Sequence, residues 1–302
     1  MEKTAAKQAT AELPDAVGEF LASKSGNSLG TVNTYRAYLN SYFKWKRGTS
    51  IDMKSYDKYI LYLKGKHRSQ NGVATAATVL REYAKFLKIN VADWQTPRTH
   101  AVTTPHLSSN EIEIMHNAFN RMEHSERNRF IFDFLIGTGL RVGELLALRW
   151  SDMDLGGDMA VCNVRQAKGN KSRTIRLNAG ARRAAMRYAR FLFGDNVSTD
   201  RLRLTTDRVL DITTKEAVEW MLSKAASLAG LDTIGLHPHM LRHTFGVMAS
   251  TGKNRMSQRQ LQLYMGHASI ATTQRYQQFA DLEDSDEFAK TDFSGSPSNG
   301  AN

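Results

Sequence analysis

Apolar residues recur at spacings of three and four through most of the first hundred residues. In residues 28–46 they fall at Val32, Tyr35, Leu39, Tyr42 and Phe43. The same period returns in residues 52–66 and 73–90. It is the period of an amphipathic α-helix, which buries one face and exposes the other. The first hundred residues are therefore predicted to form a helical domain.

A stretch with two prolines and no helical period, residues 93–105, separates this domain from the rest. The chain is then again mainly helical, except in residues 159–178, where apolar and polar residues alternate on both sides of Gly169 and Asn170. Such alternation around a short turn predicts a β-hairpin. We therefore expect a mainly α protein with a small antiparallel β-sheet. The expected divisions are a helical domain, a linker, an α-rich second domain and a partly disordered acidic tail: residues 1–98, 99–105, 106–280 and 281–302.

Positive charge is spread over both predicted domains. The 302 residues have a net charge of +11, with +8 in residues 1–100, +8 in residues 101–276 and −5 in residues 277–302. Two basic domains are typical of a protein that holds a polyanion, although a basic surface can also serve solubility alone. We expect nucleic acid as the partner. The expected DNA contacts are basic residues of predicted turns and of the hairpin: Lys44, Lys46, Arg47, Lys64, Lys66, Arg68, Lys171 and Arg173.

The cysteine content and the hydropathy pattern bound the cellular compartment. Cys162 is the only cysteine, which excludes a disulfide framework and a cysteine-based zinc site. No apolar run approaches the length of a membrane span, and the N-terminal residues lack the apolar core of a signal peptide. These observations predict an intracellular, cytoplasmic protein.

Two segments in the first half of the second domain carry cations suited to a phosphate. In residues 137–150, glycines flank Arg141, which precedes Glu144 by three residues. A fixed arginine suits bidentate contact with phosphate oxygens, but an Arg–Glu pair at this spacing is equally a surface ion pair of a helix. In the hairpin, Lys168 lies beside the turn. It is either a solvated lysine or a proton donor whose pKa is lowered by other cations.

A third segment, residues 235–246, is rich in histidine. On a helix, His239 shares a face with Arg242 at a spacing of three and with His243 at a spacing of four. Two histidines four residues apart also have a zinc-binding spacing. However, no HExxH glutamate accompanies them, and the arginine on their face disfavours a metal cation.

The fourth segment, residues 263–279, contains a Gly-His pair and then a tyrosine. His267 follows Gly266, and Tyr276 comes nine residues later. On its own Tyr276 is an ordinary tyrosine of a polar, helix-compatible run. The separation nevertheless allows it to face the same cleft as His267.

In this order the four segments resemble the tyrosine recombinase (phage integrase) family. The family pattern is an arginine in GxRxxEL, a lysine in a KGxKxR hairpin, then HxLRHT, GH and a tyrosine. The counterparts here are Arg141, Lys168, His239 with Arg242, His267 and Tyr276. The resemblance covers residues 106–280 and extends more loosely to the N-terminal domain. It implies a helical, SAM-like core-binding domain and a catalytic domain with the DNA breaking–rejoining enzyme fold.

The resemblance implies site-specific DNA recombination through a 3′-phosphotyrosyl intermediate. Tyr276 would attack phosphorus, and the two arginines and His267 would hold the phosphate oxygens. Lys168 would protonate the leaving 5′-oxygen, and His239 would take the tyrosine proton or help to place it. Glu144 would orient an arginine or a histidine without itself contacting the phosphate. Because these side chains supply the positive charge, no cofactor, metal ion or ATP is expected.

The family also implies partners and a setting. These are double-stranded DNA recombination sites, a homotetramer on synapsed DNA with a dimer on each site, an accessory directionality protein, and the nucleoid of a bacterial, archaeal or mobile-element host. The tail would interlock neighbouring subunits through Phe279, Leu282 and Phe288, or it is a frayed acidic end. Integration, excision, inversion and dimer resolution all remain open.

Three other functions are compatible with parts of the pattern. A type IB topoisomerase uses a similar set of arginine, lysine, histidine and tyrosine, but relaxes DNA without a partner site. A DNA-binding protein with lapsed catalytic residues would lack some of the six catalytic positions, all of which are intact here. A metal-dependent nuclease would use the histidines as ligands. The compact helical N-terminal domain and the spacing of the histidine motifs favour recombination.

Overall fold

The structure is a computed structural model of the whole chain. It describes residues 14–66, 69–97, 105–157, 159–165, 172–251, 255–267, 269–274, 276–277 and 281. The chain divides into two compact units, residues 1–102 and 103–302. Among the described helices, none is both long and apolar enough to span a membrane.

The first unit is helical, as the apolar period predicted. Its helices are α1 (Asp15–Ser23), α2 (Leu29–Lys46), α3 (Met53–Gly65) and α4 (Gln70–Phe86). Side-chain caps start the last three, because Ser28, Asp52 and Ser69 each accept a hydrogen bond from a backbone N–H of the first turn. The core of this unit is rich in aromatic rings, including Phe20, Tyr42, Tyr59 and Tyr83.

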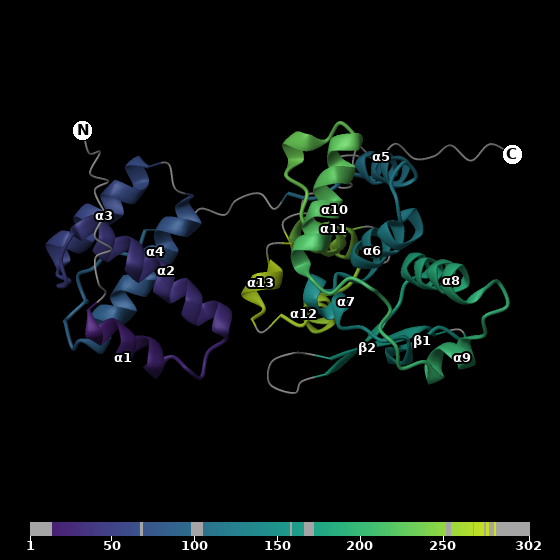
Figure 1. Cartoon of the computed structure of the whole chain (residues 1–302), viewed down its shortest axis with the longest axis horizontal. Coiled ribbons are helices and arrows are strands. Elements are labelled where there is room, and N and C mark those ends of the chain that lie inside the picture. Colours follow the sequence, from purple (N-terminus) through teal and green to yellow (C-terminus); the bar gives the residue numbers. More distant parts are fainter. Residues whose placement is uncertain are drawn as a thin grey trace, which may run out of the picture. The chain divides into compact units, whose positions relative to one another are not determined.

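In the second unit a small sheet lies at one edge of a group of helices (Figure 1). The helices are α5 (Ser109–Phe119), α6 (Ser125–Thr138), α7 (Val142–Leu146), α8 (Ala179–Phe193), α9 (Thr199–Leu204), α10 (Lys215–Leu228), α11 (Pro238–Ser250), α12 (Gln258–Met265) and α13 (Ala271–Gln274). Two 3-10 turns, Trp150–Asp152 and Asp232–Ile234, join them. The central helix is α6, whose phenylalanines are buried and which packs against both α8 and α11.

The sheet has three antiparallel strands in the order β1 (Met153–Asp154), β2 (Val161–Val164) and β3 (Arg173–Arg176). The sequence predicted the hairpin of β2 and β3 but not β1. In the structure, Cys162 of β2 lies opposite Ile175 of β3. At two residues, β1 is too short for an alternating pattern to appear in the sequence. The predicted tip at Gly169 and Asn170 lies outside the described residues.

Two hydrophobic clusters stabilise the second unit. The main cluster joins residues of α5, α6, α8, α10 and the sheet, with Trp150 and Phe130 among its largest side chains. A small satellite cluster lies between α11, α12 and the segment after α13, and consists of Phe245, Val247, Leu261, Met265 and Tyr276. The predicted nucleophile is therefore a core residue of this satellite cluster.

Candidate active site

A cleft of about 990 Å³ opens at the N-terminal ends of α10 and α11. Four predicted site residues line it, namely Arg141, Glu144, His239 and Arg242. Lys215, the first residue of α10, and the backbone of Gly266 lie on its wall. Cationic side chains and two helix N-termini favour an anion, because the unpaired backbone N–H groups of a helix start carry partial positive charge.

Glu144 holds two arginines at the base of the cleft. Its carboxylate accepts hydrogen bonds from the backbone N–H of Arg141 at 2.9 Å and from the Arg141 guanidinium at 3.0 Å. It also accepts a bidentate pair from Arg173 at 2.9 and 3.0 Å. Burial raises the pKa of Glu144, but the hydrogen bonds from Arg173 and the Arg141 backbone outweigh burial, and the net pKa is lowered. Glu144 is therefore an ionised anchor that leaves 42% of the Arg141 side chain exposed to the cleft.

Arg242 is fixed by backbone carbonyls. It is only 3% exposed, and it donates to the carbonyl oxygen of Gly139 at 2.5 Å and to that of Met265 at 2.6 Å. Burial, and next the charge of Arg141, lower its pKa to about 10. Arg242 thus remains protonated at neutral pH, with its guanidinium already oriented.

The C-terminal end of α12 contacts both arginines through its backbone, just before His267. Arg141 donates to the carbonyl of Gly266 at 3.1 Å, next to the Met265 carbonyl that Arg242 binds. Gly266 ends the helix in the left-handed conformation, with φ of +65°. The His267 ring then pairs through Nδ1 with Thr273 Oγ1 at 2.9 Å. Both arginines are therefore attached to the backbone immediately before this histidine.

Tyr276 lies along one face of α11. Its side chain is 1% exposed, and its hydroxyl is 2.8 Å from Nδ1 of His243. The ring rests on Gly246, where an added Cβ would come within 2.3 Å of Tyr276 Cζ. Ser250 Oγ donates to the Tyr276 carbonyl at 3.3 Å. Tyr276 is thus positioned by three residues on one face of the helix that also carries Arg242.

His239 and His243, the spacing weighed for zinc, have different surroundings. Their ring centroids are 6.0 Å apart, with His239 on the cleft and His243 on the Tyr276 hydroxyl. Burial, and next the positive charge of Arg242, lower the pKa of His239. A neutral His239 follows at neutral pH, because protonation would add a charge beside the arginines.

Several predicted residues lie elsewhere. Lys168, Lys171 and Arg68 are outside the described residues, as are most of the linker and almost all of the tail. Lys44, Arg47, Lys64 and Lys66 are exposed on the first unit, so they are accessible to DNA.

Two of the expected DNA contacts are used within the protein. Arg173 commits its guanidinium to Glu144 and to the carbonyl of Tyr264 at 2.8 Å. Lys46 donates to Ser50, Asp52 and Ser55 at 2.7 to 3.2 Å. Oxygens of the protein itself thus hold both side chains, and DNA contact by these two residues stays a prediction.

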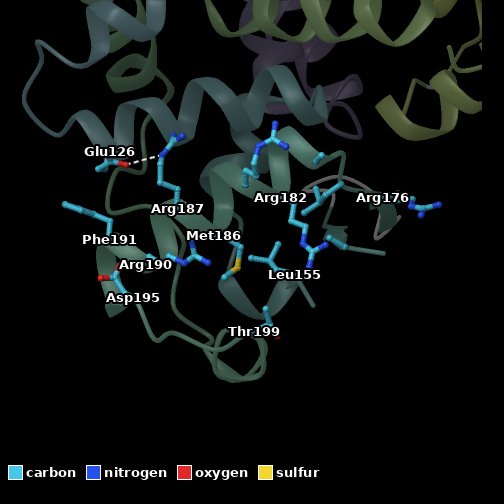
Figure 2. Close-up of a pocket in the computed structure, with 14 residues that line it drawn as sticks. Glu126, Leu155, Arg176, Arg182, Met186, Arg187, Arg190, Phe191, Asp195 and Thr199 are labelled. Carbon is cyan, nitrogen blue, oxygen red and sulfur yellow. Dashed lines mark hydrogen bonds and ion pairs between the residues drawn. The ribbon is translucent and has the colours of Figure 1, made fainter. Parts of the chain in front are cut away.

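A second concavity, of about 1070 Å³, lies along α8 and contains none of the predicted catalytic residues. Figure 2 shows Arg182, Arg187 and Arg190 on its wall, with Met186 between them. Glu126 pairs with Arg187 at 3.1 Å. Part of the basic charge of the second unit is thus separate from the cleft that Arg141, His239 and Arg242 line.

Three residues near the site were not predicted as functional. His243 contacts the hydroxyl of Tyr276, and Arg165 and Lys215 line the cleft. His243 was visible in the sequence, since it shares a helical face with Gly246 and Ser250 at spacings of three and four. Arg165 and Lys215 come from a strand end and a helix start far apart in the chain, so no local pattern marks them.

Comparison with known proteins identifies the family. Residues 105–283 match the Phage integrase family. The chain is 31% identical to tyrosine recombinase XerC of Listeria innocua, over 81% of this chain and 83% of that protein. It is 26% identical to XerC of Pediococcus pentosaceus, over 88% and 92%.

Solved structures have the same fold. The post-cleavage complex of XerH recombinase with a palindromic difH substrate aligns with a TM-score of 0.71 and 19% identity, over 91% of this chain and 84% of that chain. A lambda integrase dimer bound to a COC′ core site aligns with a TM-score of 0.64 and 16% identity, over 87% and 94%. The chain belongs to the phage integrase family of tyrosine recombinases.

Proposed function

We propose that this site-specific DNA recombinase cleaves and rejoins DNA with Tyr276 as its nucleophile. Tyr276 would attack a phosphorus atom, form a 3′-phosphotyrosyl link and release a 5′-hydroxyl. A second 5′-hydroxyl would then attack the link and restore the backbone without another energy source. The observation that carries this proposal is that α11 carries Arg242 and His239 on the cleft beside Arg141 and also packs against Tyr276, whose hydroxyl contacts His243 one helical turn from His239.

The arginines would stabilise the charge that develops on the phosphoryl oxygens. Arg242 is oriented before substrate binds, so it pays no reorganisation cost during the reaction. Arg141 offers an exposed guanidinium to the same phosphate, and His267 would donate to a non-bridging oxygen. Lys168 would protonate the leaving 5′-oxygen. Glu144 and Arg173 would position Arg141 rather than contact DNA.

The two units would divide the work on DNA. Residues 1–98 would form the core-binding domain, with Lys44, Arg47, Lys64 and Lys66 on phosphates, and residues 106–280 the catalytic domain. Recombination joins two DNA sites, so the active assembly would be a homotetramer with a dimer on each site. An accessory protein would set directionality. Deleting residues 281–302 tests the tail, because unchanged tetramer assembly on DNA would remove it from the interface.

Recombination is favoured over the alternatives by the curated relatives, which are recombinases over more than four-fifths of this chain. A plasmid assay separates them further. Joining of two sites within one plasmid is expected, whereas relaxation of a plasmid that lacks any site would indicate a topoisomerase.

A nicked suicide substrate tests the nucleophile directly. The nick lets the short 5′-hydroxyl strand diffuse away, so the covalent intermediate accumulates. The wild-type protein should form a covalent protein–DNA adduct, and Tyr276→Phe should bind the DNA without forming one. An adduct that persists in Tyr276→Phe would assign the nucleophile to another residue.

A further inference from the structure

We propose that His243, rather than His239, receives the proton of Tyr276 when the tyrosine attacks. This inference rests on the proposed function of Tyr276 and adds a residue to its mechanism. Its basis is contact with the reacting atom, because Nδ1 of His243 is 2.8 Å from the Tyr276 hydroxyl. A proton acceptor must lie within hydrogen-bond reach of the proton that it removes.

The geometry of α11 determines which histidine the hydroxyl meets. Tyr276 is fixed at Ser250 through its carbonyl and at Gly246 through its ring. These residues lie seven and three positions after His243, on the same helical face. The phenol therefore runs along the helix toward its N-terminus, and its hydroxyl ends at His243.

His239 lies one turn farther along the same face. Its ring centroid is 6.0 Å from that of His243, and His239 lines the cleft beside Arg141 and Arg242. This position suits contact with the phosphate or with solvent. His243 is partly buried between His239 and Tyr276, so a proton that it takes can later leave towards the cleft.

The proton and the bonds balance in one displacement. The Tyr276 Oη–H proton passes to Nδ1 of His243 as the Oη–P bond forms. The P–O5′ bond breaks, and the leaving oxygen takes a proton from the leaving-group acid, for which Lys168 is proposed. This requires the His243 tautomer with its proton on Nε2. Rejoining runs the same transfers in reverse. The positive charge of Arg242 would stabilise negative charge on the Tyr276 oxygen, because the two groups interact electrostatically.

The test compares histidine variants in the adduct assay over a range of pH. His243→Gln retains a polar partner for the hydroxyl but cannot titrate. We expect its adduct formation to fall about 10²- to 10⁴-fold, the usual contribution of a general base, and the acid limb of its pH–rate profile to disappear. His239→Gln should retain that limb. The matched control is His124→Asn, which replaces an exposed histidine in the left-handed conformation, and its rate should equal the wild-type rate.

A substrate with sulfur in place of the leaving 5′-oxygen separates the two proton transfers. Sulfur departs without protonation, so this substrate should rescue Lys168→Ala but not His243→Gln. Thermal melting and DNA binding report the folding of each variant, and His243→Asn replaces the Gln variant if that one unfolds. A purely structural role would lower the rate equally at every pH.

The outcomes separate this inference from the function beneath it. If the wild-type protein forms no adduct, the proposed function fails. If it forms one while His243→Gln retains the acid limb, or His239→Gln loses it, the assignment to His243 is overturned and the role of Tyr276 stands.

Discussion

The contact between Gly246 and Tyr276 makes a single methyl group a test of how the nucleophile is positioned. In Gly246→Ala the added Cβ would lie 2.3 Å from Tyr276 Cζ and 2.5 and 2.7 Å from its Cε atoms. Carbon atoms in contact are about 3.5 Å apart, so the ring must retreat by about 1.2 Å. Because α11 also packs on α6, the helix is less free to shift than the ring.

Such a displacement has a large expected effect on rate. A misplacement of about 1 Å can cost about 10²-fold in rate, so adduct formation by Gly246→Ala should fall about 100-fold. DNA affinity should stay within a factor of about three, because the substitution changes no side chain that binds phosphate. Loss of a DNA contact of about 1.4 kcal/mol would instead weaken binding tenfold. Overpacking should also lower the free energy of unfolding by about 1–3 kcal/mol, partly offset by the better helix propensity of alanine.

The measurement is the rate of adduct formation on the nicked substrate, with Gly18→Ala as the control. Gly18 is also inside a helix, but an added Cβ there meets nothing within 4 Å. The control should retain the wild-type rate and gain up to about 1 kcal/mol of stability. An adduct rate for Gly246→Ala close to that of wild type, in a folded protein, would refute the close packing of the nucleophile on α11.

Three further experiments test other parts of the structure. Glu144→Gln removes the carboxylate that two arginines share, so it should lower the free energy of unfolding by about 3 kcal/mol in urea titrations. Folding lowers the pKa of Glu144, so its contribution to stability is complete above the unfolded pKa and is lost as pH falls through the folded pKa. The free energy of unfolding of Glu144→Gln should therefore fall less steeply with decreasing pH than that of the wild type. In Gly139→Ala, at φ of +61°, the added Cβ would lie 2.3 Å from Phe245 Cδ1, so the free energy of unfolding should fall by about 3 kcal/mol. In the control Gly230→Ala φ is +71° but the added Cβ meets nothing within 4 Å, so the fall should be about 1 kcal/mol. The slope of the logarithm of the DNA-binding constant against the logarithm of salt concentration should decrease in Lys44→Ala by the amount of about one phosphate contact, because Lys44 is exposed. Lys46→Ala should leave this slope unchanged, because Lys46 is bound to Asp52.

Most of the helical architecture could be predicted from the sequence, because apolar residues recur every three or four positions within each long helix. The first-unit helices α2, α3 and α4 begin and end within a few residues of the predicted ranges. The hairpin strands were visible for the same reason. Strand β1 was not, because two residues paired to Cys162 and Val161 acquire their strand geometry from the neighbouring strand alone.

Sequence order brought forward candidate site residues but did not predict their contacts. Order along the chain identified Arg141, Arg242 and Tyr276, yet it did not indicate what each one touches. The carbonyls that hold Arg242 belong to Gly139 and Met265, which are distant in sequence. Arg173 resembled an exposed hairpin cation because its partner, Glu144, precedes it by 29 residues. Tertiary packing determines these contacts, so a local pattern does not reveal them.

The satellite cluster around Tyr276 also sets how readily this part of the unit opens. Five buried residues form it, separate from the main core of the unit. Regions with few buried apolar contacts open more readily than a main core, and native-state hydrogen exchange measures that opening. Amides of α12 should therefore exchange faster than those of α6. The satellite cluster can then open and re-form around Tyr276 while the main core of the unit stays folded.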